Sequence, residues 1–528
     1  MNQFDQILDL SEILNHSRHI RESADKRLIQ QIPKAADALL LGLQSVGFSQ
    51  SQLKAAVQER FNNTQLFQDL SIEAKDHPDP ILLNPYALFE IQIALIRSFT
   101  SQANSSSVAF FWPSKGYGTM FNQLPALLQS RPDISVIYLY GFGDDPRLSE
   151  HESAFFAGFG MIQELGFIDV FFTPTIMDCL PAKSTKVLVP HTIRGNIKEG
   201  KTPDEQVSSD SGSTDSVSEN YSDFTRMYSL FDYVTIATAE QLDSHDKLHQ
   251  FYGRSINGST DRSAHPDSEL ILKSYGAGQT ANTHCIIPTG YMSLDSLSSY
   301  CAENKTDEAR IIYAPTLSIE AWKEFTSIEP CGGEIMLSLL RAFPNHKIIF
   351  RPHPHEKETV IQPILDKVTK YPNFEYDDCK HSYIQQYSRS QLMVSDLSST
   401  AYTYPLATLN PIVFYSWNEE ELLKFDEGNQ NGYLADRSKV GAIAENCDQL
   451  ITKIESLLSE KHIWSKKIRA YKKQLIFNPD NADNYLAQHI DHIIQGTPCD
   501  EWNYYSRKKA AVRIPQTEPK LSKQLQTF

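Results

Sequence analysis

Leu392-Met-Val-Ser-Asp-Leu-Ser-Ser-Thr400 is a short apolar run that ends in polar residues and leads into a segment with helical spacing. The second half of the chain contains three more runs of this kind: Ile311-Ile-Tyr-Ala-Pro-Thr316, Lys347-Ile-Ile-Phe-Arg351 and Pro411-Ile-Val-Phe-Tyr415. Short apolar runs that alternate with helical stretches are typical of strands buried in a parallel sheet. The second half is therefore predicted to be an α/β unit.

A similar series precedes this one. Its apolar runs are Val108-Ala-Phe-Phe-Trp112, Val136-Ile-Tyr-Leu-Tyr-Gly141, Val170-Phe-Phe-Thr173, Lys186-Val-Leu-Val-Pro190 and Tyr233-Val-Thr-Ile-Ala237. Closer to the N-terminus the apolar residues recur at three-and-four spacing, which indicates helices. We predict two facing sheets and four parts: a helical region over 1–104, a Rossmann-like domain over 105–300, a second over 301–495 and a basic tail over 496–528.

The composition fits a folded chain of two domains. At 528 residues the chain is too long for one compact core, and 41% of its residues are hydrophobic. The net charge of −16 argues against a nucleic-acid partner, because surfaces that bind phosphate are usually basic. The seven cysteines include no C-x-x-C pair, so neither a zinc site nor a disulfide framework is predicted.

The sequence also predicts a location. No segment reaches the run of about 18 apolar residues that a membrane-spanning helix needs, and the first residues do not read as a signal peptide. We therefore expect a cytoplasmic protein. The basic tail over 496–528 suggests peripheral association with anionic lipid at the inner face of the membrane, and an ordinary solvated tail is the alternative.

Ligands of α/β sheets bind beyond the carboxyl ends of the strands, so the polar residues after each apolar run form the candidate site. Arg351-Pro-His-Pro-His355 offers an arginine and two histidines to phosphate oxygens, on a backbone stiffened by two prolines. Ser395-Asp-Leu-Ser-Ser-Thr400 offers hydroxyls and free backbone N–H groups at a helix start, where an anion is favoured. The alternatives are a rigid loop with surface histidines and simple helix capping.

Two segments of the first half carry similar groups. Lys115 follows an apolar run and is suited to meet a phosphate, while Gly116 and Gly118 let a ligand approach the backbone. The spacing matches neither a Walker nor a Rossmann fingerprint. His191-Thr-Ile-Arg194 also follows an apolar run, and a histidine has a pKa suited to taking a proton from an acceptor hydroxyl. The alternative for His191 is a structural histidine bonded to a loop carbonyl.

Several motifs of catalytic sites are missing from the sequence. It contains no G-x-S-x-G elbow, no H-E-x-x-H and no convincing Asp-x-Asp pair for a bridge between a metal and a nucleotide. The adjacent acids Asp144-Asp145 and Asp377-Asp378 are interpreted as solvated turns. We therefore expect a reaction without a metal ion or an organic cofactor.

Taken in order, these segments resemble the CDP-glycerol glycerophosphotransferase family, the teichoic-acid polymerases and their capsule-synthesis relatives. The family pattern runs through a His-Gly loop, a "yDyv" strand, Gly-Tyr-Pro-Arg-x-Asp, Tyr-Ala-Pro-Thr, a His-Pro pair and Ser-Asp-x-Ser-Ser. The counterparts here are His191-Thr192, Phe231-Asp-Tyr-Val234, Thr289-Gly-Tyr-Met-Ser-Leu-Asp295, Tyr313-Ala-Pro-Thr316, Arg351-Pro-His-Pro354 and Ser395-Asp-Leu-Ser-Ser399.

The resemblance implies a GT-B fold, in which two Rossmann-like domains face a cleft and the C-terminal one holds the nucleotide donor. It implies that His353, Ser398 and Ser399 contact the donor's pyrophosphate. His191 would serve as the base or on the acceptor side, so His191 and His353 are the catalytic candidates. The other candidates for binding the donor are Tyr313, Thr316, Arg351, His355, Ser395, Asp396 and Thr400, and those for an acceptor or phosphate loop are Lys115, Gly116, Gly118 and Arg194.

The implied function is transfer of a glycerophosphate or sugar unit from a nucleotide-activated donor, CDP-glycerol or a CMP- or UDP-sugar, to a surface polysaccharide or lipid-linked glycan. The chain departs from the family at Thr192, at Met292-Ser293 in place of Pro-Arg, and near Thr403, where an aspartate is expected. Two alternatives therefore stay open. One is a GT-B glycosyltransferase that uses CMP-Kdo or another nucleotide sugar in capsule or lipopolysaccharide synthesis. The other is a non-catalytic binding protein that retains the fold.

Overall fold

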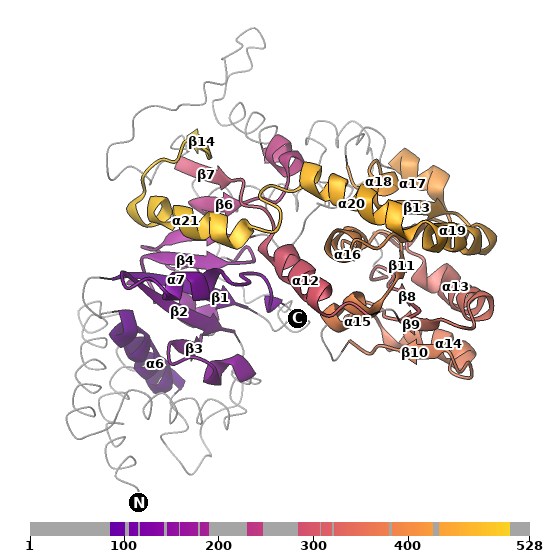
Figure 1. The fold of residues 1–528 in the computed structure, drawn as a ribbon. Coiled ribbons are helices and arrows are strands. Elements are labelled where there is room, and N and C mark those ends of the chain that lie inside the picture. The colour runs from indigo at the N-terminus through magenta and orange to yellow at the C-terminus, as the bar shows by residue number, and fades with distance from the viewer. Residues whose placement is uncertain are drawn as a thin grey trace, which may run out of the picture.

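The structure is a computed structural model, drawn in Figure 1. It describes residues 85–100, 105–113, 117–141, 145–157, 159–177, 180–189, 230–245, 283–306, 308–318, 322–379, 383–425 and 432–506. The predicted helical region up to residue 84 and the tail from residue 507 therefore lie outside the described residues.

The first sheet has eight strands within the described residues. They are β1 (Ser106–Trp112), β2 (Ile134–Tyr140), β3 (Ala154–Phe156), β4 (Val170–Thr173), β5 (Thr185–Leu188), β6 (Tyr233–Thr235), β7 (Thr283–Ile287) and β14 (Asn503–Ser506). Their order is β14-β7-β6-β5-β4-β1-β2-β3, and every neighbouring pair is parallel except β14 with β7. The order reverses between β1 and β4, as in a doubly wound nucleotide-binding sheet.

The second sheet has six strands in the described part of the chain, all parallel to their neighbours. They are β8 (Arg310–Tyr313), β9 (Lys347–Phe350), β10 (Phe374–Tyr376), β11 (Leu392–Ser395), β12 (Ile412–Tyr415) and β13 (Gly441–Ala444). Their order is β10-β9-β8-β11-β12-β13. Numbered within the sheet this is 3-2-1-4-5-6, the Rossmann order, and its switch point lies between β8 and β11.

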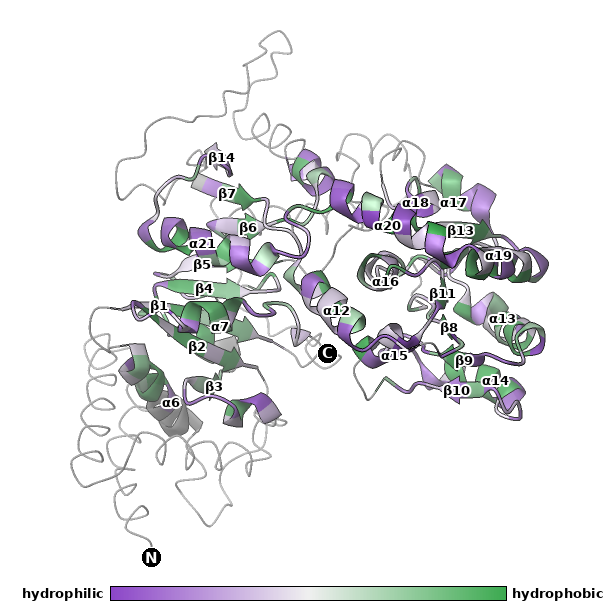
Figure 2. Ribbon diagram, viewed as in Figure 1, coloured by the Kyte–Doolittle hydropathy of each residue, from purple (hydrophilic) through white to green (hydrophobic). Residues whose placement is uncertain are grey.

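Helices cover both sheets (Figure 1). They are α6 (Pro85–Thr100), α7 (Leu124–Gln129), α8 (Phe159–Ile162), α12 (Met292–Glu303), α13 (Ile328–Ala342), α14 (Glu358–Val368), α15 (Tyr383–Arg389), α16 (Thr400–Thr408), α17 (Glu419–Phe425), α18 (Arg437–Val440), α19 (Cys447–Ser459), α20 (Lys461–Leu475) and α21 (Ala482–Gln495), with the 3-10 helix η5 (Pro146–Ser149). Figure 2 shows apolar strands inside and hydrophilic positions on the helices. In β11, Met393 belongs to one core, whereas Leu392 and Val394 belong to another. Burial on both faces explains why the strands read as continuous apolar runs.

The α/β class is confirmed, because every apolar run predicted as a strand contains one. Five further strands were not predicted: β3, β7, β10, β13 and β14. The predicted domain boundaries and the cleft between two domains stay predictions.

The end of the chain lies differently from the expected tail. α21 and residues up to Trp502 pack into the core of the first sheet, and β14 pairs with β7. Trp502 is 3% exposed, and its indole N–H donates to Tyr485 Oη at 3.1 Å. The first sheet is thus completed by residues that follow the second sheet in sequence.

Two connections between the sheets run side by side: residues 288–291, from β7 to α12, and residues 476–481, from α20 to α21. The Asp295 carboxylate accepts hydrogen bonds from Asp480 N and Ala482 N, at 3.0 and 2.9 Å. Asn478 Nδ2 donates to Pro288 O at 2.8 Å. Gly290 has φ +96°, and a Cβ added there would lie 2.3 Å from Phe477 O, so the close approach requires glycine.

A second buried acid, Asp483, lies beside this junction. Its carboxylate accepts from Asn122 Nδ2, which belongs to the loop before α7, while Asp483 Oδ1 has no partner among the described residues. Burial raises the pKa of Asp295 to about 6 and that of Asp483 to about 7, and Asp295 adds to the rise at Asp483. Both acids therefore take up a proton at a higher pH in the folded protein than in the unfolded chain.

We predict that the last described residues are required for stability. Trp502→Ala should lower the free energy of unfolding by about 3–5 kcal/mol, because a large buried ring is removed. Removing residues 507–528 should leave the urea midpoint unchanged, whereas removing 496–528 should lower it. Trp417→Ala, at a tryptophan that is 38% exposed, is the control and should cost much less. Equal midpoints for the two truncations would contradict the role of β14.

We predict that Asp483 makes stability depend on pH. Its folded-state pKa of about 7 lies above the ordinary aspartate value of 3.8, so the stability it contributes at low pH is lost as the pH rises towards 7. Asp483→Asn should raise the free energy of unfolding at pH 8 by more than about 1 kcal/mol and change it little at pH 4. Urea unfolding at both pH values measures this, with the exposed Asp448→Asn as control. A gain of the same size at both pH values would refute the assignment.

Candidate functional site

The loops after β8 and β11 are joined at the switch point of the second sheet. Thr316 follows β8 and Asp396 follows β11. The backbone N–H and the hydroxyl of Thr316 both donate to Asp396 Oδ1, at 2.7 and 2.5 Å. Two of the predicted motifs therefore form one unit, at the edge where doubly wound sheets bind their ligands.

Asp396 is 3% exposed, and protein donors occupy both of its oxygens. Oδ1 also accepts from Leu397 N at 2.8 Å. Oδ2 accepts from the backbone N–H and the hydroxyl of Ser327, both at 2.7 Å, and Ser327 directly precedes α13. Five donors saturate a carboxylate, which has about four lone-pair sites. Asp396 therefore joins both ends of the connection between β8 and α13 to the loop after β11, and it has no acceptor left for a ligand.

The start of α16 keeps groups that can bind an anion. Ser398 and Thr400 are half-buried, and Ser399 is exposed. Ser399 makes no side-chain capping bond to the helix, and Thr400 N approaches Ser398 Oγ only to 3.4 Å. The hydroxyl of Tyr433 donates to Ser398 O at 2.7 Å and so fixes this loop. The backbone N–H groups of Ala401 and Tyr402 already donate to Ser398 O and Ser399 O, at 2.9 and 3.2 Å, so the hydroxyls and the helix dipole are what this turn offers to an anion.

Arg351 begins the loop after β9 and forms a buried ion pair. Its Nη1 lies 2.5 Å from Asp377 Oδ2, and both side chains are at most 10% exposed. Asp377 follows β10. The interpretation of Asp377 as a residue of a solvated turn was wrong. It was also wrong for Asp145, which is 5% exposed and pairs with Arg147 at 2.6 Å, because each acid gains an arginine that sequence spacing did not show.

The histidines of this loop lie at its outer end. His353 is half-buried, His355 is exposed, and their ring centroids are 5.5 Å apart. Burial lowers the pKa of His353, and the neighbouring His355 adds to this. Glu356 holds the base of the loop, because its Oε2 accepts from Ser318 N at 2.7 Å. The loops after β8 and β9 are thereby linked.

Two predicted donor-binding residues are fully buried. The ring of Tyr313 lies in the core, and its hydroxyl is 2.9 Å from Ser327 Oγ. The Ser395 hydroxyl donates to Ala314 O at 2.5 Å. These residues position the loops. The groups that remain at the surface of the second sheet are His353, His355, Ser398, Ser399 and Thr400, while Thr316 is half-buried and Arg351 is buried.

The predicted residues of the first half are mostly outside the described residues: Lys115, Gly116, His191 and Arg194. Gly118 is described, and it lies exposed in the loop after β1. The next residue, Thr119, has its Oγ1 2.7 Å from Ser293 Oγ, at the start of α12. This contact brings the loop of the first sheet to the helix that leads into the second.

Sequence reasoning missed the residues that support the site: Ser327, Glu356, Asp377, Tyr387 and Tyr433. None belongs to a motif, and each contacts a residue that is distant in sequence. The position of Ser327 before a helix was the one available signal, because serine is a common residue there.

Within the described residues no group of three histidine, cysteine, aspartate or glutamate side chains is arranged to hold a metal ion. In the same residues, no helix is long and apolar enough to cross a membrane.

Residues 287–490 match the family described as CDP-Glycerol:Poly(glycerophosphate) glycerophosphotransferase. The minor teichoic acid biosynthesis protein GgaB of Bacillus subtilis (strain 168) is 26% identical over 143 residues, which are 27% of this chain and 14% of GgaB. The wall teichoic acid polymerase TagF has a similar structure, with a TM-score of 0.48 and 16% identity over 78% of this chain and 95% of that chain. The structure of S. aureus MnaA with UDP is also similar, with a TM-score of 0.45 and 10% identity over 74% of this chain and 98% of that chain.

We predict that Asp396 is the main stabilising group of this edge. Asp396→Ala leaves five donors from two loops without an acceptor, so it should lower the free energy of unfolding by about 3 kcal/mol or more. Urea unfolding measures this change. The control variant is Asp366→Ala, because the exposed Asp366 accepts a hydrogen bond from Gln362 on its own helix, α14. Its free energy of unfolding should change by no more than about 0.5 kcal/mol. Similar midpoints for the two variants would contradict the role of Asp396.

Proposed function

We propose that this chain is a divergent member of the CDP-glycerol:poly(glycerophosphate) glycerophosphotransferase family, and a transferase with a nucleotide-activated donor, because residues 287–490 match that family. It transfers a glycerophosphate unit from CDP-glycerol to a surface polysaccharide or a lipid-linked glycan. The family match and the likeness to a teichoic acid biosynthesis protein support this proposal.

One observation carries the proposal: the predicted donor motifs converge at the switch point of the second sheet. Thr316 and Asp396 are bonded there, and the start of α16 lies directly beyond Asp396. Arg351 and the two histidines follow β9, the neighbour of β8. A helix start, an arginine and histidines suit the oxygens of a diphosphate.

The proposed reaction is a displacement at phosphorus. An acceptor hydroxyl attacks the phosphorus of the glycerophosphate unit, and the bond from that phosphorus to the oxygen of the leaving CMP breaks. His191 takes the proton of the hydroxyl. Arg351, His353 and the first turn of α16 stabilise the charge that develops on the leaving nucleotide. The groups Lys115, Gly116, Gly118 and Arg194 act on the acceptor side.

A second candidate is a glycosyltransferase that uses CMP-Kdo or a UDP-sugar. Ser293 supports it, because this residue stands where the family pattern has arginine. It is 4% exposed and bonded to Thr119. The position therefore offers a neutral hydroxyl in place of a cation, which favours a less charged group nearby. In either case we propose that the protein acts at the cytoplasmic face of the membrane.

A ligand screen tests the proposal. We predict that CDP-glycerol and CDP raise the melting temperature of the protein, since a ligand at 100 times its Kd adds about 2.7 kcal/mol of stability. CMP, UDP and GDP are screened beside them, with Arg351→Gln as a variant that should respond less. A response to UDP or CMP without any to CDP-glycerol would replace the first candidate by the second. No response to any nucleotide would favour a non-catalytic protein.

Turnover is measured separately from binding. His191→Ala should lower transfer by roughly 10²–10⁴-fold, the usual range of general-base catalysis, and leave the Kd for CDP within a few-fold. Near-normal turnover by this variant would remove His191 from the mechanism while leaving the donor site intact.

A further inference from the structure

We propose that Asp377 and Tyr387 are positioning residues of the donor site, which hold Arg351 and Thr400 in a fixed relation to each other. The inference rests on the proposed function, because it assigns the arginine and the helix start to one bound diphosphate. Neither Asp377 nor Tyr387 belongs to the motifs that suggested the site. Both come from the segment between β10 and β11, which borders it.

The ion pair fixes the direction of the Arg351 side chain. Asp377 accepts from Arg351 Nη1 at 2.5 Å through Oδ2. Asp377 N in turn donates to Phe350 O at 3.0 Å, which extends the ladder between β9 and β10 by one residue. The carboxylate is therefore fixed to the same strand that carries Arg351. A guanidinium held by one of its ends presents its remaining N–H groups in a defined direction.

A short turn after Asp377 adds a second restraint on the loop that carries Arg351. Asp377 Oδ1 accepts from Cys379 N at 3.0 Å, and Cys379 has φ +62°, the left-handed region. The Cys379 thiol donates to Pro352 O at 3.1 Å. Residues 377–379 thus contact both Arg351 and the residue after it, which restrains the backbone that leads to His353.

Tyr387 fixes the start of α16, the other part of the proposed donor site. Its side chain is buried, and its hydroxyl is hydrogen-bonded to Thr400 Oγ1, at the first residue of α16. The ring of Tyr383, one turn earlier on α15, lies 5.0 Å from that of Tyr387. Burial raises the pKa of Tyr387, and the Thr400 bond and the positive charge of Arg351 oppose this rise.

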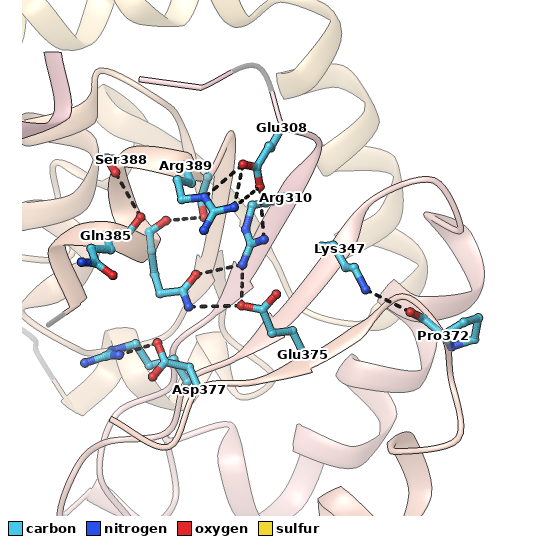
Figure 3. Close-up of polar contacts among 12 residues, drawn as sticks. Glu308, Arg310, Lys347, Pro372, Glu375, Asp377, Gln385, Ser388 and Arg389 are labelled. Carbon is cyan, nitrogen blue, oxygen red and sulfur yellow. Dashed lines mark hydrogen bonds and ion pairs between the residues drawn. The ribbon is translucent and has the colours of Figure 1, made fainter. Parts of the chain in front are cut away.

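The same edge strand offers a matched control. Glu375 on β10 accepts from Arg310 Nη2 at 2.5 Å, and the Arg310 side chain is 6% exposed. The ion-pair distance and the burial of the arginine are thus similar to those of Asp377 with Arg351. Figure 3 shows Glu375 in a cluster with Arg310, Glu308 and Arg389, while Asp377 lies outside it. Arg310 begins β8, whereas the proposed site lies beyond its other end. Glu375→Gln disturbs β10 without touching the site.

The experiment is a double-mutant cycle in which the Kd for CDP is measured by calorimetry. Asp377→Asn should weaken binding by roughly tenfold or more, as small misplacements of binding groups do. Arg351→Gln should weaken it similarly, and the double variant should bind no more weakly than Arg351→Gln alone, because Asp377 acts through Arg351. Asp377→Asn leaves the buried charge of Arg351 unpaired, and this variant can therefore fold poorly. The double variant removes both charges, so its Kd can still be measured in that case. Tyr387→Phe should weaken binding, and Glu375→Gln should lower stability but leave the Kd within about twofold.

Three results would overturn the inference: an unchanged Kd in Asp377→Asn together with a loss in Arg351→Gln, additive losses in the double variant, or an equal loss of affinity in Glu375→Gln. Failure of the proposed function looks different. In that case the wild-type protein binds none of the nucleotides. The same variants measured with inorganic pyrophosphate then still decide whether Asp377 and Tyr387 position an anion site.

Discussion

The ligand edge of the second sheet depends on one buried carboxylate. Asp396, in the loop after β11, accepts hydrogen bonds from both ends of the connection between β8 and α13, so two loops distant in sequence have one arrangement. The cation of Arg351, in the loop after β9, is likewise held by a buried carboxylate, that of Asp377. The proposed anion site therefore combines a paired cation with the hydroxyls at the start of α16, and such groups need fixed positions to be effective.

The sequence predicted the sheets better than the supports of the site. Long apolar runs such as Val108–Trp112 identify strands buried on both faces, whereas β10 and β13 were missed because Phe-Glu-Tyr and Gly-Ala-Ile-Ala are short and carry little apolar signal. The motifs at the ends of β8, β9 and β11 do lie at one edge. Their internal roles were beyond sequence reasoning: Tyr313 and Ser395 point into the protein, and Asp377 finds Arg351 only because β10 lies beside β9. Pairing across strands depends on register, and short motifs do not encode it.

The departures at Met292 and Ser293 are built into the junction of the two sheets. Met292 lies in the core of the first sheet, Leu294 lies in a core of the second, and Ser293 between them bonds to Thr119. Asp295, the acid of the same segment, holds the returning chain at Asp480 and Ala482. Both residues are thus part of the packing at this junction. These two departures from the family pattern lie where the loop after β1 meets the start of α12, whereas the one near Thr403 lies on α16 of the second sheet.

The return of α21 and β14 to the first sheet has a consequence for how the protein is made. A ribosome releases the strands from β1 to β7 first, then the whole of the second sheet, and only afterwards the helix and edge strand that finish the first core. The second sheet is continuous in sequence and can close on itself while the nascent chain is still growing. The earlier half must wait, with the face that α21 covers still open, until the final segment emerges. Of the two described sheets, the one whose strands are synthesised earlier is completed later, which reverses the usual N-terminal-first order of domain folding during translation.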